Sequence, residues 1–261
     1  MADDQLNDLK RKCVLAHRIL TMTGSMGDMT GHVFVCVPGT DTFLTRCRNG
    51  DDVSPAYVQP RCLHLIDLDG DAAEDVGEWT IPPERYIGST IMKLRPEINC
   101  VIHAHPPGQV LCSIIGEEIR PIVGAQNWGG SRIALGGIPE YPRSLLIHSK
   151  EIGAAMMSVM GNKDYCILKA HGNVVAGKTV EEATVNAIRL ENIAKLTWQF
   201  AIAGQPSPDL PWDDWVDNLR PTAGAETGMR GGAFWSWDYY VQRLGENPVI
   251  PRESTVDIEQ Y

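Results

Sequence analysis

Two histidines one residue apart follow a short apolar, β-branched run in the segment Asn99–Pro107, which reads Asn-Cys-Val-Ile-His-Ala-His-Pro-Pro. Residues i and i+2 of a strand point to the same face, so the imidazoles of His103 and His105 are predicted to converge. Pro106 and Pro107 end the strand because neither can donate a ladder hydrogen bond. Imidazole is the commonest metal ligand. The pair therefore indicates a metal site at a strand end, although two hydrogen-bonded structural histidines would give the same pattern.

A third histidine and an acidic residue strengthen the metal interpretation. His171 lies at the bend of the segment Ile167–Gly177, which reads as strand, turn and strand. Glu84 follows two prolines and opens a predicted helix over Glu84–Leu94, where the helix dipole stabilises a carboxylate. A catalytic metal site needs about three protein ligands and an open position. The three histidines would supply those ligands.

The segments around these residues resemble those of the class II aldolase/adducin family, over roughly residues 8 to 205. The resemblance implies a three-layer α/β/α fold with a central, mainly antiparallel sheet. It implies one divalent metal ion per subunit, Zn²⁺ or Mn²⁺ with Fe²⁺ and Co²⁺ as further candidates, and a homotetramer with active sites near subunit interfaces. In that case His103, His105 and His171 bind the metal and Glu84 is the catalytic acid or base. The matching residues are Glu84, Arg95-Pro96-Glu97, Val101 to Pro107, and His171 to Ala183.

The elements with which family members bind sugar phosphates are altered in this chain. Such members typically carry Gly-Asn-hydrophobic-Ser at the first strand of a hairpin, which we predict here over residues 32–37 and 42–46. This chain reads Gly31-His32-Val33-Phe34 there, and Pro82-Pro83 stands before the acid where phosphate-binding members usually have serines. A proline pair offers neither hydroxyl nor amide donors. These differences indicate that the phosphate site has been lost.

Three residues near this hairpin are candidates for substrate binding. Arg46 and Arg48 stand two apart, so on a strand their guanidiniums would share a face and could enter one pocket. A guanidinium pairs bidentately with a carboxylate. The alternative is a solvated edge strand that carries two charges. His32 also has two possible roles: it is either a pocket residue or a hydrogen-bonding residue of the turn.

Family membership leaves three functions to compare. The first is a metal-dependent decarboxylase of an aromatic ortho-hydroxy (di)carboxylic acid, a lyase of aromatic catabolism, like family members that act on dihydroxyphthalate or hydroxy-pyridine dicarboxylate. The second is an aldolase, epimerase or dehydratase that acts on a sugar (phosphate) through a metal-bound enediolate, with Glu84 as base. The third is a non-catalytic, adducin-like module, which the three intact histidines disfavour. The missing phosphate elements and the paired arginines favour the first.

Composition excludes several classes of partner. The net charge of −10 argues against a nucleic-acid or anionic-membrane partner. No apolar run approaches the roughly 20 residues that span a bilayer, and the acidic N-terminus does not resemble a signal peptide. The seven cysteines are scattered and form no Cys-x-x-Cys motif, which favours reduced thiols in a cytoplasmic protein.

The chain divides into a predicted catalytic domain, residues 1–205, and a C-terminal extension, residues 206–261, rich in proline, glycine and aromatic residues. We expect the extension to pack on the pocket or on a neighbouring subunit, because its tryptophans and tyrosines need burial. Within the first domain, residues 61–80 read as two strands around an acidic turn. Residues 124–137 are rich in glycine and indicate a loop.

Overall fold

The computed structural model describes residues 2–50, 54–122, 128–205, 213 and 225–246. In this part of the chain seven strands form one sheet in the order β3-β2-β1-β4-β7-β6-β5. All neighbouring strands are antiparallel except β5 and β6, which are parallel. The strands are β1 (His32–Cys36), β2 (Thr42–Arg46), β3 (Leu63–Asp67), β4 (Cys100–Ala104), β5 (Glu140–Tyr141), β6 (Tyr165–Leu168) and β7 (Gly172–Gly177).

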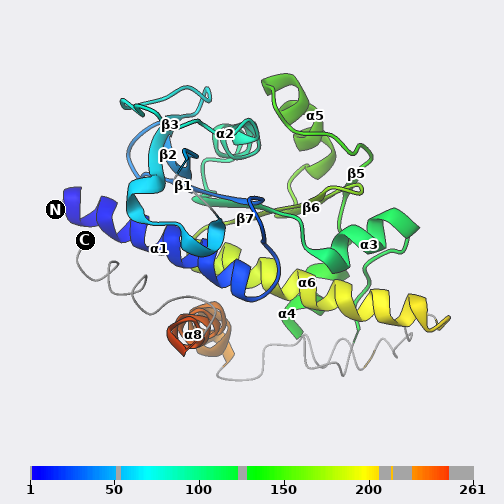
Figure 1. Cartoon of the computed structure of the whole chain (residues 1–261). Coiled ribbons are helices and arrows are strands. Elements are labelled where there is room, and N and C mark those ends of the chain that lie inside the picture. The colour runs from blue at the N-terminus through cyan, green and yellow to red at the C-terminus, as the bar shows by residue number, and fades with distance from the viewer. Residues whose placement is uncertain (1, 51–53, 123–127, 206–212, 214–224, 247–261) are drawn as a thin grey trace.

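Helices cover both faces of this sheet (Figure 1). One face carries α1 (Ala2–Met22), α3 (Pro107–Ile115), α4 (Trp128–Leu135), α6 (Val180–Ile202) and α8 (Ala225–Glu246). The other carries α2 (Arg85–Leu94) and α5 (Lys150–Met160), and two short 3₁₀ turns, η1 (Pro55–Tyr57) and η2 (Pro60–Cys62), precede β3. Each face has its own apolar core, and along β4 the side chains alternate between the two, with Ile102 in one and Val101 in the other. The predicted three-layer α/β/α fold is confirmed.

Side-chain caps set the starts of two helices. The Ser149 hydroxyl accepts a hydrogen bond from the Ile152 amide at 3.3 Å and begins α5. The Thr179 hydroxyl accepts one from the Glu182 amide at 3.1 Å and begins α6. The Glu182 carboxylate in turn accepts the Lys178 amide at 2.8 Å. These caps satisfy amides that the first helical turn leaves without partners.

Two local predictions are wrong. Residues 128–135 of the predicted glycine-rich loop form α4, and residues 124–127 lie outside the described part. Gly129 of α4 leaves room for the Arg189 side chain of α6, because a Cβ at position 129 would lie 2.4 Å from Cδ of Arg189. Residues 61–80 contain only one strand, β3, because the Asp67 carboxylate accepts the Asp69 and Asp71 amides, each at 2.9 Å. These bonds hold the following backbone in a turn.

The C-terminal helix α8 packs on α1 and α6. Trp237 and Leu244 are buried there, whereas Trp235 and Tyr239 are 68% and 54% exposed. Much of the extension, residues 206–212, 214–224 and 247–261, lies outside the described part. Its packing on the pocket or on a neighbouring subunit stays a prediction, as does the boundary at residue 205. None of the described helices combines the length and the apolar character that crossing a membrane requires.

Candidate metal centre

Four side chains from three segments meet at one end of the sheet. Glu84 precedes α2, His103 lies on β4, His105 follows β4, and His171 lies in the β6–β7 turn. Each offers one ligand atom, and these four atoms lie within 4.8 Å of one another. Nε2 of His103 is 3.1 Å from Nε2 of His105 and 3.3 Å from Oε2 of Glu84, and Nε2 of His171 is 3.5 Å from Oε1 of Glu84. The predicted convergence of the two strand histidines is confirmed.

A tight turn and a close strand contact place His171. The preceding residue, Ala170, has φ +52, in the left-handed region that non-glycine residues rarely adopt. The Ser113 hydroxyl of α3 accepts the Ala170 amide at 2.9 Å and holds this turn in place. The following residue must be glycine, because a Cβ on Gly172 would lie 2.2 Å from the Ala104 carbonyl oxygen. The backbone of β7 therefore approaches that of β4 beside the histidines.

The electrostatics of the cluster suit a divalent cation. Burial, together with the charge of His103, lowers the pKa of His105 to about 4, and burial also lowers the pKa of His171. Both rings are thus neutral at pH 7, the form that binds metals. Burial opposes ionisation of Glu84, but the charge and hydrogen bond of His103, with the charges of His171 and His32, lower its pKa to about 2. A bound cation would act on the pKa of Glu84 in the same direction as these positive charges.

An unsatisfied atom supports the same fit. Oε1 of Glu84 is buried and has no hydrogen-bond partner among the described residues. A buried carboxylate oxygen without a donor is unfavourable, and a nearby cation would stabilise it. Three imidazoles with a carboxylate beside them fit zinc, manganese, iron or cobalt. These residues can therefore hold one divalent metal ion.

A buried polar network behind the cluster orients His103. Nδ1 of His103 is 2.8 Å from the Asn173 carbonyl oxygen, so Nδ1 carries the proton and Nε2 remains for the metal. The Asn173 side chain accepts the Ala104 amide at 3.2 Å and donates to Gln109 at 2.9 Å. Gln109 donates its backbone amide to the Glu191 carboxylate at 3.3 Å. Asn173, Gln109 and Glu191 are all buried, and sequence reasoning missed all three as site residues.

His32 lies inside the site. It is paired directly opposite His103 across β1 and β4, so both side chains point to the same face of the sheet. The ring is buried, stacks on Phe34 with centroids 5.9 Å apart, and has an Nδ1 without a hydrogen-bond partner in the described part of the chain. Burial and the charges of His103 and Arg46 hold its pKa well below the usual range. The ring is therefore neutral at pH 7.

The two arginines converge on a backbone carbonyl. Nη2 of Arg46 donates to the Met29 carbonyl oxygen at 2.9 Å, and Nη2 of Arg48 donates to the same oxygen. Arg46 is fully buried, and its charge also helps to lower the pKa of His17 on α1, behind burial itself. Arg48 is partly exposed, and the charges of both guanidiniums contribute to lowering the pKa of His32. Their contact with a substrate stays a prediction, for which Arg48 is the more accessible of the two.

An open cavity of about 340 Å³ lies beside the candidate metal ligands. Its lining residues are His105, Ser144, Leu145, Leu146, Ala170 and His171. Two of the candidate ligands, His105 and His171, thus border open space that a small molecule could enter. The arrangement combines a metal site, a buried carboxylate and an accessible open side, which is what metal-assisted proton transfer requires.

Comparison with known proteins agrees with this geometry. The Class II Aldolase and Adducin N-terminal domain family matches residues 11–198. The 3,4-dihydroxyphthalate decarboxylase of Arthrobacter keyseri is 35% identical over 83% of this chain and 89% of its own length. The enzyme of the same name from Rhodococcus jostii (strain RHA1) is 34% identical over 84% and 90%.

The fold is shared with solved structures. L-fuculose 1-phosphate aldolase from Glaciozyma antarctica PI12 superimposes with a TM-score of 0.77, covering 94% of this chain and 92% of its own. The two sequences are 19% identical, so this likeness concerns the fold alone. The two decarboxylases named above support the prediction that this chain is a lyase, and an aldol reaction has no stronger support than decarboxylation. The chain belongs to the class II aldolase and adducin family, which confirms the family predicted from its sequence.

Proposed function

We propose that this protein is a divalent-metal-dependent carboxy-lyase that removes CO₂ from an aromatic ortho-hydroxy (di)carboxylic acid. The observation that carries the proposal is its 32–35% identity to three 3,4-dihydroxyphthalate decarboxylases over most of its length. The intact cluster of three histidines and one glutamate supports the metal dependence. The prolines at positions 82 and 83, in place of phosphate-binding serines, support a substrate without a phosphate.

In this proposal His103, His105 and His171 hold one metal ion per subunit through their Nε2 atoms. When bound, the ion acts as a Lewis acid and a template for a ring oxygen and the neighbouring carboxylate of the substrate. Zn²⁺ and Mn²⁺ are the first candidates, followed by Fe²⁺ and Co²⁺. The Asn173 carbonyl supports the site by accepting a hydrogen bond from Nδ1 of His103, which fixes the tautomer.

Glu84 moves the proton. Its lowered pKa makes it a carboxylate at neutral pH, so it first accepts the proton of the substrate's ring hydroxyl. It then donates this proton to the ring carbon that bears the carboxylate. As the bond to the carboxylate breaks, its electron pair returns to the ring and CO₂ leaves. The ring oxygen finally regains a proton from water, so each turnover consumes one proton overall.

Arg48 and His32 orient the substrate. Arg48, with Arg46 behind it, binds a second carboxylate of the substrate, and the planar guanidinium favours bidentate pairing. The neutral His32, whose Nδ1 has no partner in the described part of the chain, binds a ring hydroxyl. The buried His32 ring, paired opposite His103 across β1 and β4, would help to keep water away from the reacting carbon.

We further propose a cytoplasmic homotetramer with active sites near the subunit interfaces. The exposed Trp235 and Tyr239 on α8 support an additional contact surface, because large exposed aromatic side chains favour association. Light scattering at micromolar concentration should give four times the mass of one chain. A monomer under these conditions would contradict the assembly and leave the reaction to be tested separately.

The reaction is tested with a substrate panel. The metal-loaded protein should release CO₂ stoichiometrically from hydroxy-aromatic dicarboxylates, including 3,4-dihydroxyphthalate, and release no aldehyde from sugar phosphates. The His105→Ala variant is the matched control, because it should lack the metal and release no CO₂. Cleavage of a sugar phosphate without CO₂ release would refute the proposal and favour the aldolase, epimerase or dehydratase alternative.

A further inference from the structure

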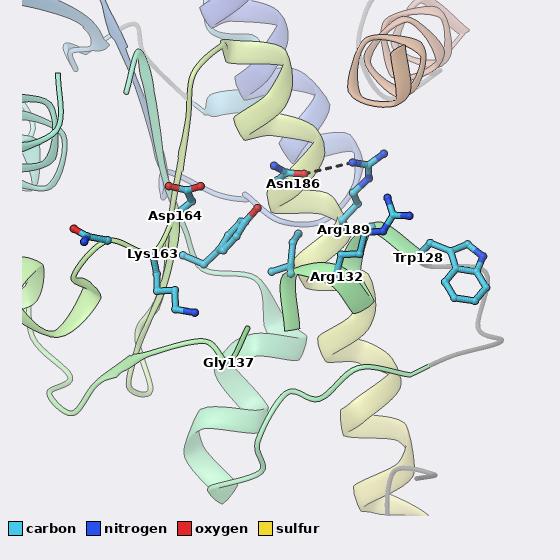
Figure 2. Close-up of a pocket in the computed structure, with 11 residues that line it drawn as sticks. Trp128, Arg132, Gly137, Lys163, Asp164, Asn186 and Arg189 are labelled. Carbon is cyan, nitrogen blue, oxygen red and sulfur yellow. Dashed lines mark hydrogen bonds between the residues drawn. The ribbon is translucent and has the colours of Figure 1, made fainter. Parts of the chain in front are cut away.

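A cavity of about 530 Å³ lies away from the metal centre, between α4, the start of β6 and α6 (Figure 2). Its volume is typical of small-molecule sites. Tyr165, the first residue of β6, lines it and packs against the apolar core on the α6 face. His171 follows the other end of the same strand, and Glu84 precedes a helix on the opposite face. The cavity is thus separated from the metal centre by the sheet.

The cavity is basic in an acidic protein. Arg132 of α4, Arg189 of α6 and Lys163 line it, against one acidic residue, Asp164. The Asp164 carboxylate is itself paired with the Arg95 guanidinium at 2.8 Å. The whole chain carries a net charge of −10, so this concentration of cations is a local exception. Cations gathered in a concave site favour binding of an anion.

The two guanidiniums are held beside each other. Figure 2 shows Arg132 and Arg189 close together, and after burial the charge of Arg132 contributes to lowering the pKa of Arg189. Arg189 is positioned from two sides: its Nη1 donates to Oδ1 of Asn186 at 3.4 Å, and its Cδ fills the space where Gly129 lacks a Cβ. Two guanidiniums held side by side on a cavity wall offer several N–H donors to one carboxylate.

Aromatic groups complete the cavity. Trp128 lies next to the arginines in Figure 2, and this residue is 37% exposed. An indole face favours an aromatic ring, and guanidinium forks favour a carboxylate. We propose that this cavity binds a small aromatic carboxylate, with its carboxylate on Arg132 and Arg189 and its ring against Trp128. This site is separate from the metal centre, and the proposal does not depend on the reaction proposed above.

Benzoate is the probe that tests this site, with its binding to the full-length protein measured by calorimetry. Arg132→Gln should weaken binding roughly ten- to hundredfold, as expected for losing a charge-assisted hydrogen bond. Arg132 is exposed, so this variant should fold normally. Arg120→Gln is the charge-matched control, because Arg120 is exposed, pairs with Glu118 and lies outside the cavity lining. It should bind benzoate as the wild type does.

Three further measurements distinguish binding in this cavity from binding at the metal centre and from a purely electrostatic attraction. Gly129→Ala changes no charge but displaces Arg189, so it should weaken binding as well. His105→Ala removes a metal ligand and should leave benzoate binding at the cavity intact. Cyclohexanecarboxylate, which has the charge without the aromatic ring, should bind more weakly than benzoate. Equal binding of the two acids would overturn the role of Trp128.

Four other results would overturn the proposal. These are the absence of saturable benzoate binding, unchanged affinity in both Arg132→Gln and Gly129→Ala, and loss of binding in His105→Ala, which would place the anion at the metal centre. The fourth is a change of oligomeric state in Arg132→Gln with unchanged benzoate affinity. That result would make the cavity a contact between copies of the chain.

Discussion

Replacing Gly172 with alanine should loosen the metal centre without touching a ligand. The added Cβ would lie 2.2 Å from the Ala104 carbonyl oxygen and 2.8 Å from Cδ2 of His105, where ordinary contacts begin at 3.4 Å. The β4 and β7 backbones must therefore move apart by roughly 1 Å, and overpacking of this kind costs about 1–3 kcal/mol of stability. Functional side chains must hold their geometry to within about 0.5 Å. We expect metal affinity to fall roughly ten- to hundredfold, as when a group supporting a ligand is removed.

Two measurements on Gly172→Ala check this reasoning. Urea unfolding of the metal-free protein gives the loss of stability, and titration against a competing chelator gives the metal affinity. Gly245→Ala in α8 is the matched control, because nothing lies within 4 Å of a Cβ there. It should bind metal as the wild type does and lose no stability. Wild-type metal affinity in Gly172→Ala would refute the claim that this strand contact positions His105 and His171.

Three more predictions address the ligands, the substrate residues and the buried His17. His103→Ala should lower the metal content measured by elemental analysis while the circular dichroism spectrum stays unchanged. If the wild-type protein kept its full activity after a chelator had removed its metal, a metal role would be contradicted. Glu84→Gln should lower kcat more than it raises KM, because it keeps substrate binding and loses proton transfer. Arg48→Ala should lower kcat/KM on an aromatic dicarboxylate about ten- to hundredfold, because the lost charge-assisted hydrogen bond contributes roughly 1.5–3 kcal/mol. Arg48→Lys should retain only part of the wild-type kcat/KM, since lysine lacks the planar fork. Wild-type kinetics in both variants would contradict a role for Arg48 in substrate binding. Burial, followed by the charge of Arg46, lowers the pKa of His17 to about 3, so its stabilising contribution is present above pH 6.5 and is lost as the pH falls towards 3. The urea midpoint of His17→Gln should therefore fall less than that of the wild type between pH 7 and pH 4.5, and equal falls would contradict this assignment.

The histidine pair at the candidate metal site and the strand β4 that leads into it could be predicted from the sequence, because both depend on local geometry. His103 and His105 are two residues apart, and the strand period alone places them on one face. The caps of α5 and α6 are equally local, since Ser149 and Thr179 bond to amides three residues later. The position of Glu84 before a helix was also visible in the sequence. Its meeting with the histidines was expected only from the family resemblance.

The tertiary structure decided the features that depend on contacts between distant segments. The hydrogen bonds that link His103 to Asn173, Asn173 to Gln109 and Gln109 to Glu191 each join residues 64 to 82 positions apart, and no local pattern marks these residues. The glycine-rich α4 was predicted as a loop because the reason for Gly129, the side chain of Arg189, comes sixty residues later. Arg46 and Arg48 stand two apart, but β2 ends at Arg46 and Arg48 lies beyond it, and the packing of the whole chain buries the first and leaves the second partly exposed. Periodicity reports the direction of a side chain from its own strand or helix, whereas the partner it meets depends on how the whole chain packs.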